Sequence, residues 1–239
     1  MKYSFTLLSI LLVNILSAEM INLPPFHTIV SGPHVELELK NGLDEAMEIE
    51  TDGVSMEEVI YEVKGKTLHI YLRNARNIEK TKKYKNGRSK WSVGIYKDSK
   101  IKATITYRDL RKLVTKGKER VNINGPIGGQ SFKYKSYGDQ KVSFASIETE
   151  NFRAKLYGET DLKIKNGYAD LQRYKLYGDH NIDTQNVKTK KVKASNFGEV
   201  DLDVDTKIVA LTSFGIADIK SKSRAVVRKG IVIGETRIR

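Results

Sequence analysis

The side chains of this sequence that could perform acid–base chemistry are five aspartates in its C-terminal half. Glycoside hydrolysis requires paired carboxyl groups about 5 to 10 Å apart. The aspartates recur with the repeat described below, and in a repeat almost any acidic column meets that spacing. A polysaccharide-acting enzyme, lyase or hydrolase, is therefore an alternative that rests on fold analogy. The residues concerned are Asp161, Asp179, Asp183, Asp201 and Asp203.

Other catalytic and metal-binding patterns are missing from the sequence. The four histidines (His27, His34, His69 and His180) do not have metal-ligand spacing. There are no cysteines, which excludes thiolate chemistry. The chain also contains no nucleophile elbow, phosphate loop or dinucleotide-binding turn. We therefore expect no catalytic residue, no cofactor and no metal, and a protein that is not an enzyme.

Binding chemistry is better represented, because basic residues recur at fixed offsets before a repeated glycine. They alternate with apolar residues, so we expect them to face solvent. Cations beside aromatic rings would bind a polyanion by counterion release and stacking. Alternatively, the acidic residues after each glycine pair with them across the corner, and the surface is only solvated. The ligand candidates are Lys133, Arg153, Arg173 and Lys193, five residues before a glycine, and Lys135, Lys155 and Lys175, three residues before it.

A second basic segment lies between residues 77 and 100 and contains the only tryptophan of the chain. We interpret it as a long exposed loop that contacts a lipid headgroup or a glycan, because loops often carry function. A soluble connection between two strands explains the segment equally well. Its ligand candidates are Lys83, Lys85, Arg88 and Trp91.

The glycine that orders these positions belongs to a repeat of about 20 residues. The apolar residues on both sides of it alternate with polar ones, as in strands with one buried face. One such unit cannot bury its apolar face alone, whereas stacked coils pair equivalent strands in parallel and in register. The sequence therefore predicts an all-β fold, with a right-handed parallel β-helix, or β-solenoid, over residues 127–239. The glycines are Gly138, Gly158, Gly178, Gly198, Gly215 and Gly234.

Residues 19–126 are predicted to form a less regular β-rich half that continues into the solenoid as one domain, 19–239. Alternating segments separated by Gly, Pro and Asn turn signals indicate its strands. Residues 107–113 are predicted as a turn or a short helix. The expected strands are 35–39, 47–50, 68–72, 103–106 and 121–123.

The first 18 residues have the basic, apolar and small-residue order of a signal peptide. An uncleaved anchor is the alternative, although the apolar run is short for a spanning helix. No other segment is apolar enough to cross a membrane. We therefore predict an exported protein, located in the periplasm or at the cell surface.

Charge is distributed unevenly along the chain. The net charge is +13, but residues 19–62 hold eleven acids and one base, while residues 63–239 hold 40 bases and 18 acids. A basic exported body indicates an anionic glycan, lipopolysaccharide or an envelope protein as partner; nucleic acid is not expected. Alternatively, the acidic segment neutralises part of the basic body internally.

The N-terminal half carries a resemblance to a known family. The segment 26–39, with its Ser-Gly turn between two strands, the strand around Met47, the pair Val63 and Leu68–Ile70, and Ile105–Leu113 followed by Gly117 match in type and order. The sequence resembles the putative autotransporter adhesin head GIN domain family of exported bacterial proteins. The resemblance implies a β-helical fold in the cell envelope, and it supplies no catalytic residues. Within the 239 residues we find no translocator barrel, wall anchor or sorting tail.

Two functional hypotheses follow from the sequence. In the first, the protein is an envelope binding module that presents a flat β face to a glycan, a lipid-type anion or a partner protein. In the second, it is a structural protein whose exposed last coil is capped by another chain, because open solenoid ends invite strand addition. Ile238, near the end of the sequence, indicates a short final coil with an open edge.

Overall fold

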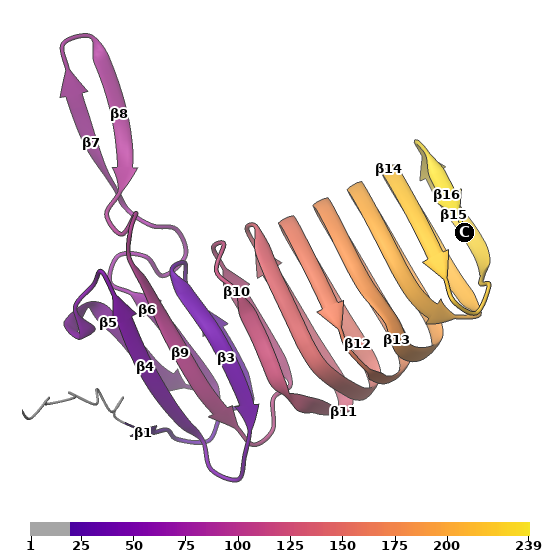
Figure 1. The fold of residues 1–239 in the computed structure, drawn as a ribbon, viewed down its shortest axis with the longest axis horizontal. Helices are drawn as coiled ribbons and strands as arrows, with labels where there is room; N and C mark the ends of the chain where they lie inside the picture. Colours follow the sequence, from indigo (N-terminus) through magenta and orange to yellow (C-terminus); the bar gives the residue numbers. More distant parts are fainter. Residues whose placement is uncertain (1–19) are drawn as a thin grey trace, which may run out of the picture.

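The computed structural model describes residues 20–239, so the predicted signal peptide lies outside the described residues. A 14-stranded sheet winds along the whole of this part of the chain, and two further strands form a small separate sheet (Figure 1). The large sheet is a β-solenoid of about six turns, whose parallel pairs lie about 20 residues apart. The prediction of an all-β solenoid is confirmed.

The C-terminal half consists of stacked coils that pair in parallel and in register. Phe132 lies beside Phe152, and Leu156 beside Leu176, one coil apart. Each strand in this region bends around the corners of its coil, which is why some are very long. They are β11 (Val121–Tyr137), β12 (Gln140–Ile164), β13 (Gly167–Thr206), β14 (Ile208–Ser221), β15 (Val226–Ile233) and β16 (Thr236–Ile238).

The N-terminal half begins the same stack and closes its end with antiparallel strands. Parallel pairs join β2, β10 and β6 on one side and β3, β9 and β11 on the other. Antiparallel β4 and β5 then cover β9 and β6, respectively. The strands are β1 (Ile21–Asn22), β2 (Thr28–Ser31), β3 (Val35–Asn41), β4 (Ala46–Asp52), β5 (Val59–Lys64), β6 (Thr67–Leu72), β9 (Lys100–Tyr107) and β10 (Lys112–Lys116).

The five strands predicted in the N-terminal half are all present, but two other predictions there need correction. Of the two alternatives for residues 107–113, the helix is wrong: β9 ends at Tyr107, the chain bends at Arg108 and Asp109, and β10 begins at Lys112. The one helical turn in residues 20–239 is the 3₁₀ turn η1, Met56–Glu58. The segment 77–100 is not a long loop, because β7 (Thr81–Asn86) and β8 (Ser89–Gly94) pair in it as an antiparallel hairpin.

The recurring glycines form a column at one corner of the solenoid. Each has φ between +93° and +142°, a region that disfavours residues with a Cβ. A Cβ on Gly178 would also collide with the backbone carbonyl oxygen of Gly158, one coil earlier. Glycine is thus required twice, by the turn at the corner and by the close approach of consecutive coils.

The core runs through the interior of the coils as stacked apolar side chains. Phe132 and Phe152 lie 6.2 Å apart in adjacent coils, and Phe144 packs edge-on against both at 5.8 Å. Polar interior residues are mostly satisfied: the Gln140 side-chain oxygen accepts hydrogen bonds from Thr115 and Ser136. Such networks make buried polar groups tolerable.

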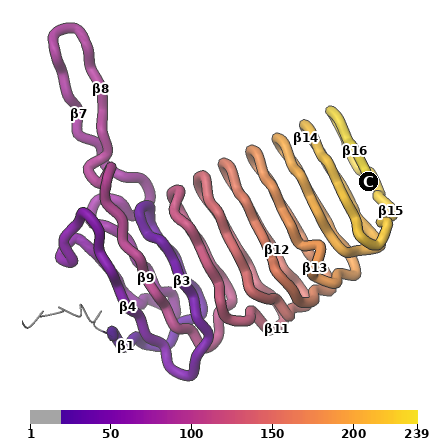
Figure 2. The backbone as a smooth tube through the Cα atoms, in the orientation of Figure 1, coloured from indigo at the N-terminus to yellow at the C-terminus, as the bar shows by residue number. Residues whose placement is uncertain are grey.

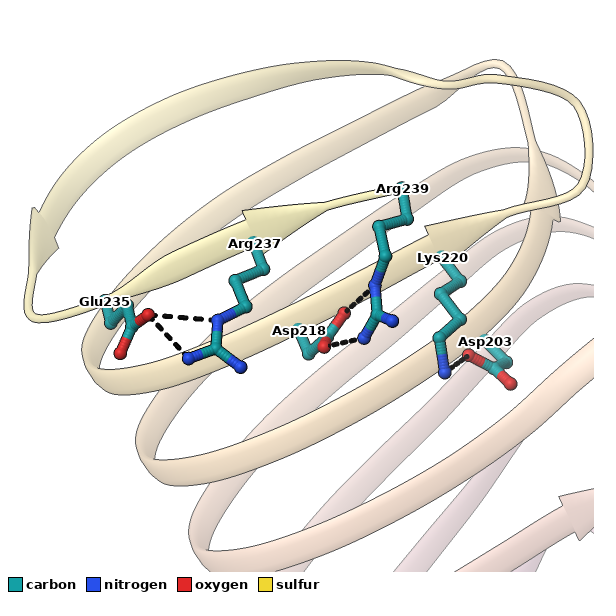
Figure 3. Close-up of polar contacts among 6 residues, drawn as sticks. All are labelled: Asp203, Asp218, Lys220, Glu235, Arg237 and Arg239. Atoms are coloured by element: carbon teal, nitrogen blue, oxygen red, sulfur yellow. Dashed lines mark hydrogen bonds and ion pairs between the residues drawn. The ribbon is translucent and has the colours of Figure 1, made fainter.

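An ion pair on the outer surface joins the last coil to the previous one, while the interior of the last coil is more exposed. Arg239 pairs with Asp218 of the previous coil, and Lys220 of that coil pairs in turn with Asp203, one coil earlier, at 3.8 Å (Figure 3). Ile219 is fully buried, whereas Ile238, at the same position one coil later, is 46% exposed. Within residues 20–239 the interior of this coil is therefore less buried than that of the coil before it.

Candidate binding face of the solenoid

The predicted basic residues of the repeat gather on one side of the solenoid. The register places Lys133, Arg153 and Arg173 side by side in consecutive coils, and Lys135 beside Lys155 and Lys175. The aromatic residues before the glycines lie on the same side. We call this surface the basic–aromatic face; it comprises Lys133, Arg153, Arg173, Lys193, Lys135, Lys155, Lys175, Tyr137, Tyr157, Tyr177, Phe197 and Phe214.

Strand alternation explains why these side chains point outward. The residues between them, such as Phe132, Tyr134 and Ser136, are buried in the core. Because successive residues of a strand point to opposite faces, Lys133, Lys135 and Tyr137 must face solvent. The orientation of the aromatic residues, which the sequence left undecided, is therefore outward.

The basic column is longer than the sequence analysis recognised. Lys112 in β10 pairs in register with Lys133, which adds a fifth cation to the column. Its coil ends at Gly117, whose φ is +100° and which lies directly beneath Gly138. Gly117 precedes Gly138 by 21 residues, so extending the glycine spacing backwards by one step would have revealed this coil.

The cations of this face lack ionic partners in the described chain. None of the seven predicted lysines and arginines has a carboxylate of residues 20–239 within 4.0 Å. The acidic residues beyond the glycine corner, such as Asp139 and Glu159, therefore do not pair with them. The alternative in which cross-corner pairs neutralise the basic columns is wrong. Like charges about 4.8 Å apart remain there, screened only by water and salt.

The aromatic residues stack on one another along the solenoid axis. Ring centroids are 4.9 Å apart for Tyr137–Tyr157 and for Tyr157–Tyr177, with nearly parallel planes. Phe197 and Phe214 continue the column at 5.2 and 5.1 Å. Because the three inner rings are covered on both faces by their neighbours, only the edges of these rings are open to a ligand. We call this column of stacked rings the rail. The sequence analysis expected the rings of a ligand to stack on these aromatic residues, but the inner rings already stack on one another.

The rail also positions Lys155, one of the cations next to it. The Lys155 Nζ atom lies 5.0 Å from the centroid of Tyr157 and 5.5 Å from that of Tyr177. The Tyr157 contact raises the pKa of Lys155 above its ordinary value, so this lysine stays charged. A cation held beside the two stacked rings loses some of its side-chain freedom before a ligand arrives.

The five aspartates of the enzyme hypothesis lie on the neighbouring side, beyond the glycine corner. Three of them are engaged: Asp183 with Lys163 at 2.8 Å, Asp203 with Lys220, and Asp161 with the Asn181 amide. Burial alone would raise the pKa of Asp183, but hydrogen bonds from Lys163 and Gln185 outweigh it and lower this pKa. A general acid needs a raised pKa, so the arrangement does not favour hydrolysis.

A shallow groove on this acidic side has a buried histidine at its base. Its rim carries Asp139, Glu159, Asp179 and Glu199. His180 is 5% exposed, and neither ring nitrogen has a hydrogen-bond partner in residues 20–239. Burial lowers the pKa of His180 to about 4. The side chain is therefore a neutral imidazole at neutral pH.

The second group of predicted ligand residues lies apart from the basic–aromatic face. Lys83, Lys85, Arg88 and Trp91 belong to the β7–β8 hairpin, which stands clear of the coils (Figures 1 and 2). The structure therefore does not combine the two groups in one site. The signal missed in the sequence is Gly87, because a glycine at the first position of a two-residue loop is typical of a hairpin turn.

Metal and membrane-spanning features are absent from the described chain. In residues 20–239 no three His, Cys, Asp or Glu side chains gather in an arrangement that could hold a metal ion. Over the same residues, no helix has the length and apolar character needed to cross a membrane.

The fold and the repeat together define a β-solenoid protein. Residues 25–225 match the family described as putative auto-transporter adhesin, head GIN domain. The chain belongs to this family, as its N-terminal segments and glycine repeat predicted. No curated protein sequence is similar enough to be counted as a relative.

Solved structures with low sequence identity share the fold. A putative adhesin from Bacteroides fragilis is 20% identical, with a TM-score of 0.71 and coverage of 93% of this chain and 96% of that chain. A putative adhesin from Parabacteroides merdae is 15% identical, with a TM-score of 0.60 and coverage of 93% and 94%. A protein from Parabacteroides distasonis described as a putative lipid binding protein is 15% identical, with a TM-score of 0.59 and coverage of 93% and 96%.

Proposed function

We propose that this protein is an exported, non-catalytic binding module whose basic–aromatic face holds an acidic polysaccharide. The observation that carries the proposal is the set of aligned cations without ionic partners among residues 20–239. Family membership supports an adhesin-type role at the cell envelope, in the periplasm or on the surface. The charged sugars of lipopolysaccharide are one source of acidic glycan. The experiment described below distinguishes binding of these sugars from binding of lipid.

The geometry suits an extended chain of anions. The cations repeat at the coil spacing of about 4.8 Å, and the rail of stacked rings runs parallel to them. A flexible polyanion that lies along the columns contacts several cations at once and releases their counterions. The ring edges exclude water on one side of the cation columns, and they do not select a particular sugar. The face therefore favours a polymer over a small ligand.

The test is binding of residues 19–239 to an acidic polysaccharide, to lipopolysaccharide and to phosphatidylglycerol vesicles at low and moderate salt. Changing Lys133, Arg153, Arg173 and Lys193 to Gln is expected to weaken polysaccharide binding about 30-fold at low salt, about 0.5 kcal/mol for each cation. The Parabacteroides distasonis neighbour described as lipid binding is the reason for including vesicles.

A matched control removes the same charge from other sides of the coils. Lys141, Lys165, Lys188 and Lys207 are exposed, and their change to Gln should reduce binding only slightly. If both quadruple variants lose affinity equally, net charge and not the face binds the polymer, and the proposal fails. It also fails if the wild-type protein binds none of the polysaccharides at low salt.

A second candidate function, head-to-tail stacking of copies, is favoured by the open last coil. No strand of the described chain pairs with the outer edges of β15 and β16, and unpaired edges invite strand addition. Residues 220–239 hold seven bases and one acid, whereas residues 41–62, at the opposite end, hold eight acids and no base (Figure 2). A second copy of this chain offers the complementary charge, and a heterologous contact of this kind would build a linear assembly.

Sedimentation velocity over a range of protein concentrations tests the stacking. We expect association that Ile238→Asp abolishes, because the change removes an apolar contact at the open end and adds a charge that an acidic partner surface repels. Val226→Asp is the control, since Val226 is 64% exposed and points away from the coil interior. A protein that stays monomeric at all concentrations would exclude this function.

A further inference from the structure

The β7–β8 hairpin, which we call the arm, is a two-sided ribbon with lysines on one face and the aromatic residues, together with Lys82, on the other. Its register places Tyr84 opposite Trp91 and Lys85 opposite Lys90. Alternation then puts Lys83, Lys85 and Lys90 on one face, and Lys82, Tyr84, Trp91 and Val93 on the other. The Tyr84 and Trp91 rings stack at 5.8 Å, with planes 15° apart.

The free arm contains features that lower its own stability. Residues 80–97 contain seven bases and no acid, and none of these bases has an ionic partner in residues 20–239. Lys85 directly opposite Lys90 is a destabilising like-charge pair. Tyr84 and Trp91 remain 46% and 48% exposed. An isolated two-stranded hairpin is only marginally stable in water. The unpaired bases and exposed rings therefore stabilise the arm only when a ligand covers them.

The root of the arm, in contrast, is firmly held. Glu79 pairs with His34 at 3.2 Å, and its carboxylate also accepts the Tyr96 backbone N–H. Tyr96 is buried, and its hydroxyl lies 2.8 Å from both a Glu58 carboxylate oxygen and the Arg73 carbonyl oxygen. A tight two-residue turn with φ of +58° at Gly87 shapes the tip. The arm is a defined projection and not a disordered linker.

We propose that the arm docks, tip first, into the headgroup layer of an anionic phospholipid bilayer. A flat ligand could cover only one face of the ribbon, leaving either the lysines or the aromatic rings uncovered. A ribbon that enters the headgroup layer by its tip exposes both faces to that layer at once. Lysines and arginine then meet lipid phosphates, and Trp and Tyr take the interfacial position that they favour in membrane proteins.

The dimensions fit this docking. Trp91 lies two residue pairs from the last pair of the arm, Asn86 and Ser89, which corresponds to about 7 Å along a strand. Interfacial segments bury their apolar side chains about 5 to 10 Å deep. The rings would thus reach the boundary between headgroups and acyl chains while the body stays in water. Figure 1 shows the arm projecting away from the coils, which leaves its tip accessible.

The single tryptophan of the chain makes the test direct, because all tryptophan emission comes from the arm. With residues 19–239 and vesicles of phosphatidylcholine containing phosphatidylglycerol, we expect a blue shift of Trp91 emission and quenching by brominated acyl chains. Vesicles of phosphatidylcholine alone should give neither. Changing Lys83, Lys85 and Lys90 to Gln should weaken vesicle binding about 100-fold, about fivefold for each charge.

The control variant changes Lys165, Lys188 and Lys207 to Gln, which removes the same charge from exposed positions in the coils. If this variant and the arm variant lose vesicle binding equally, or if the protein sediments with vesicles while Trp91 emission stays constant, the proposal is wrong. It is also wrong if a soluble acidic polysaccharide shifts Trp91 emission as the vesicles do. If the arm variant still binds polysaccharide, then polysaccharide binding by the basic–aromatic face and membrane docking by the arm are separate functions.

Discussion

Replacing Gly178 by alanine is expected to lower the free energy of unfolding by about 2 to 6 kcal/mol. Gly178 has φ of +118°, and a strained backbone of this kind costs a residue with a Cβ about 1 to 3 kcal/mol. The added methyl group would also meet the carbonyl oxygen of Gly158 in the coil below. That atom is backbone, so rotation of a side chain cannot relieve the clash, and overpacking adds about 1 to 3 kcal/mol.

Two other glycines of the chain separate the effect of backbone strain from the effect of the Cβ clash. Gly129 has φ of +98°, but a methyl group on its Cα would meet only open space, so Gly129→Ala should show the backbone strain alone, about 1 to 3 kcal/mol. Gly128 has neither a positive φ nor a contact closer than 3.9 Å, so Gly128→Ala should change stability by less than about 1 kcal/mol. Urea unfolding of the three variants gives the comparison. Equal losses at Gly128 and Gly178 would contradict the proposed role of the glycine column.

The second large effect is expected at His180 and depends on pH. Burial lowers its pKa to about 4 in the folded protein, whereas an unfolded histidine titrates near 6.5. Between these values the unfolded chain binds a proton that the folded chain does not. The stability of the wild-type protein is therefore lost as pH falls through this window, by about 3 kcal/mol in total from this residue.

Changing His180 to Val removes this pH dependence. Valine already occupies the equivalent interior position one coil later, Val200, which is fully buried. We expect His180→Val to be about 1 kcal/mol more stable at pH 7, because two unpartnered ring nitrogens leave the core. At pH 4.5 the difference should grow to about 3 to 4 kcal/mol, since the protonation of the unfolded histidine adds to it.

Denaturant unfolding at pH 7 and pH 4.5 measures this difference directly. Carboxylates titrate in the same range in both proteins, so their contribution cancels between wild type and variant. His180→Gln is a useful companion, because it is neutral at both pH values and retains a polar group. Parallel pH profiles of wild type and His180→Val would show that the histidine has the same pKa in the folded and unfolded states and would overturn its assignment as a core residue with a lowered pKa.

Much of the fold could be predicted because its determinants are local. Alternation around Phe132 or Leu162 fixes which side chains are buried, and the glycine spacing fixes the length of a coil. Once coils of equal length stack, the register follows, so the alignment of Lys133 with Arg153 and Arg173 needed no further information. The coil that ends at Gly117 escaped notice only because the repeat was counted from Gly138.

The predictions that failed concern contacts across space. The acidic column beyond the glycine corner could have paired with the basic one, but the corner directs Asp139 and Glu159 to a different side of the coil. The basic segment 77–100 looked like a loop, because Lys82 to Lys85 do not alternate with apolar residues. Its strands pair with each other, and no sheet of the described body pairs with them, so the usual burial signal never arises.

The sequence by itself therefore determined a stack of β coils with a cationic side, because periodicity and alternation are properties of neighbouring residues. Only the tertiary structure decided that the aromatic rings point outward and cover one another, that the cations have no ionic partner in the described chain, and that the arm projects with two distinct faces. These outcomes depend on how the backbone turns at each corner and on which strands meet. The turns decide which residues, about 20 positions apart, come together in adjacent coils. A local sequence pattern does not encode the angle of each turn.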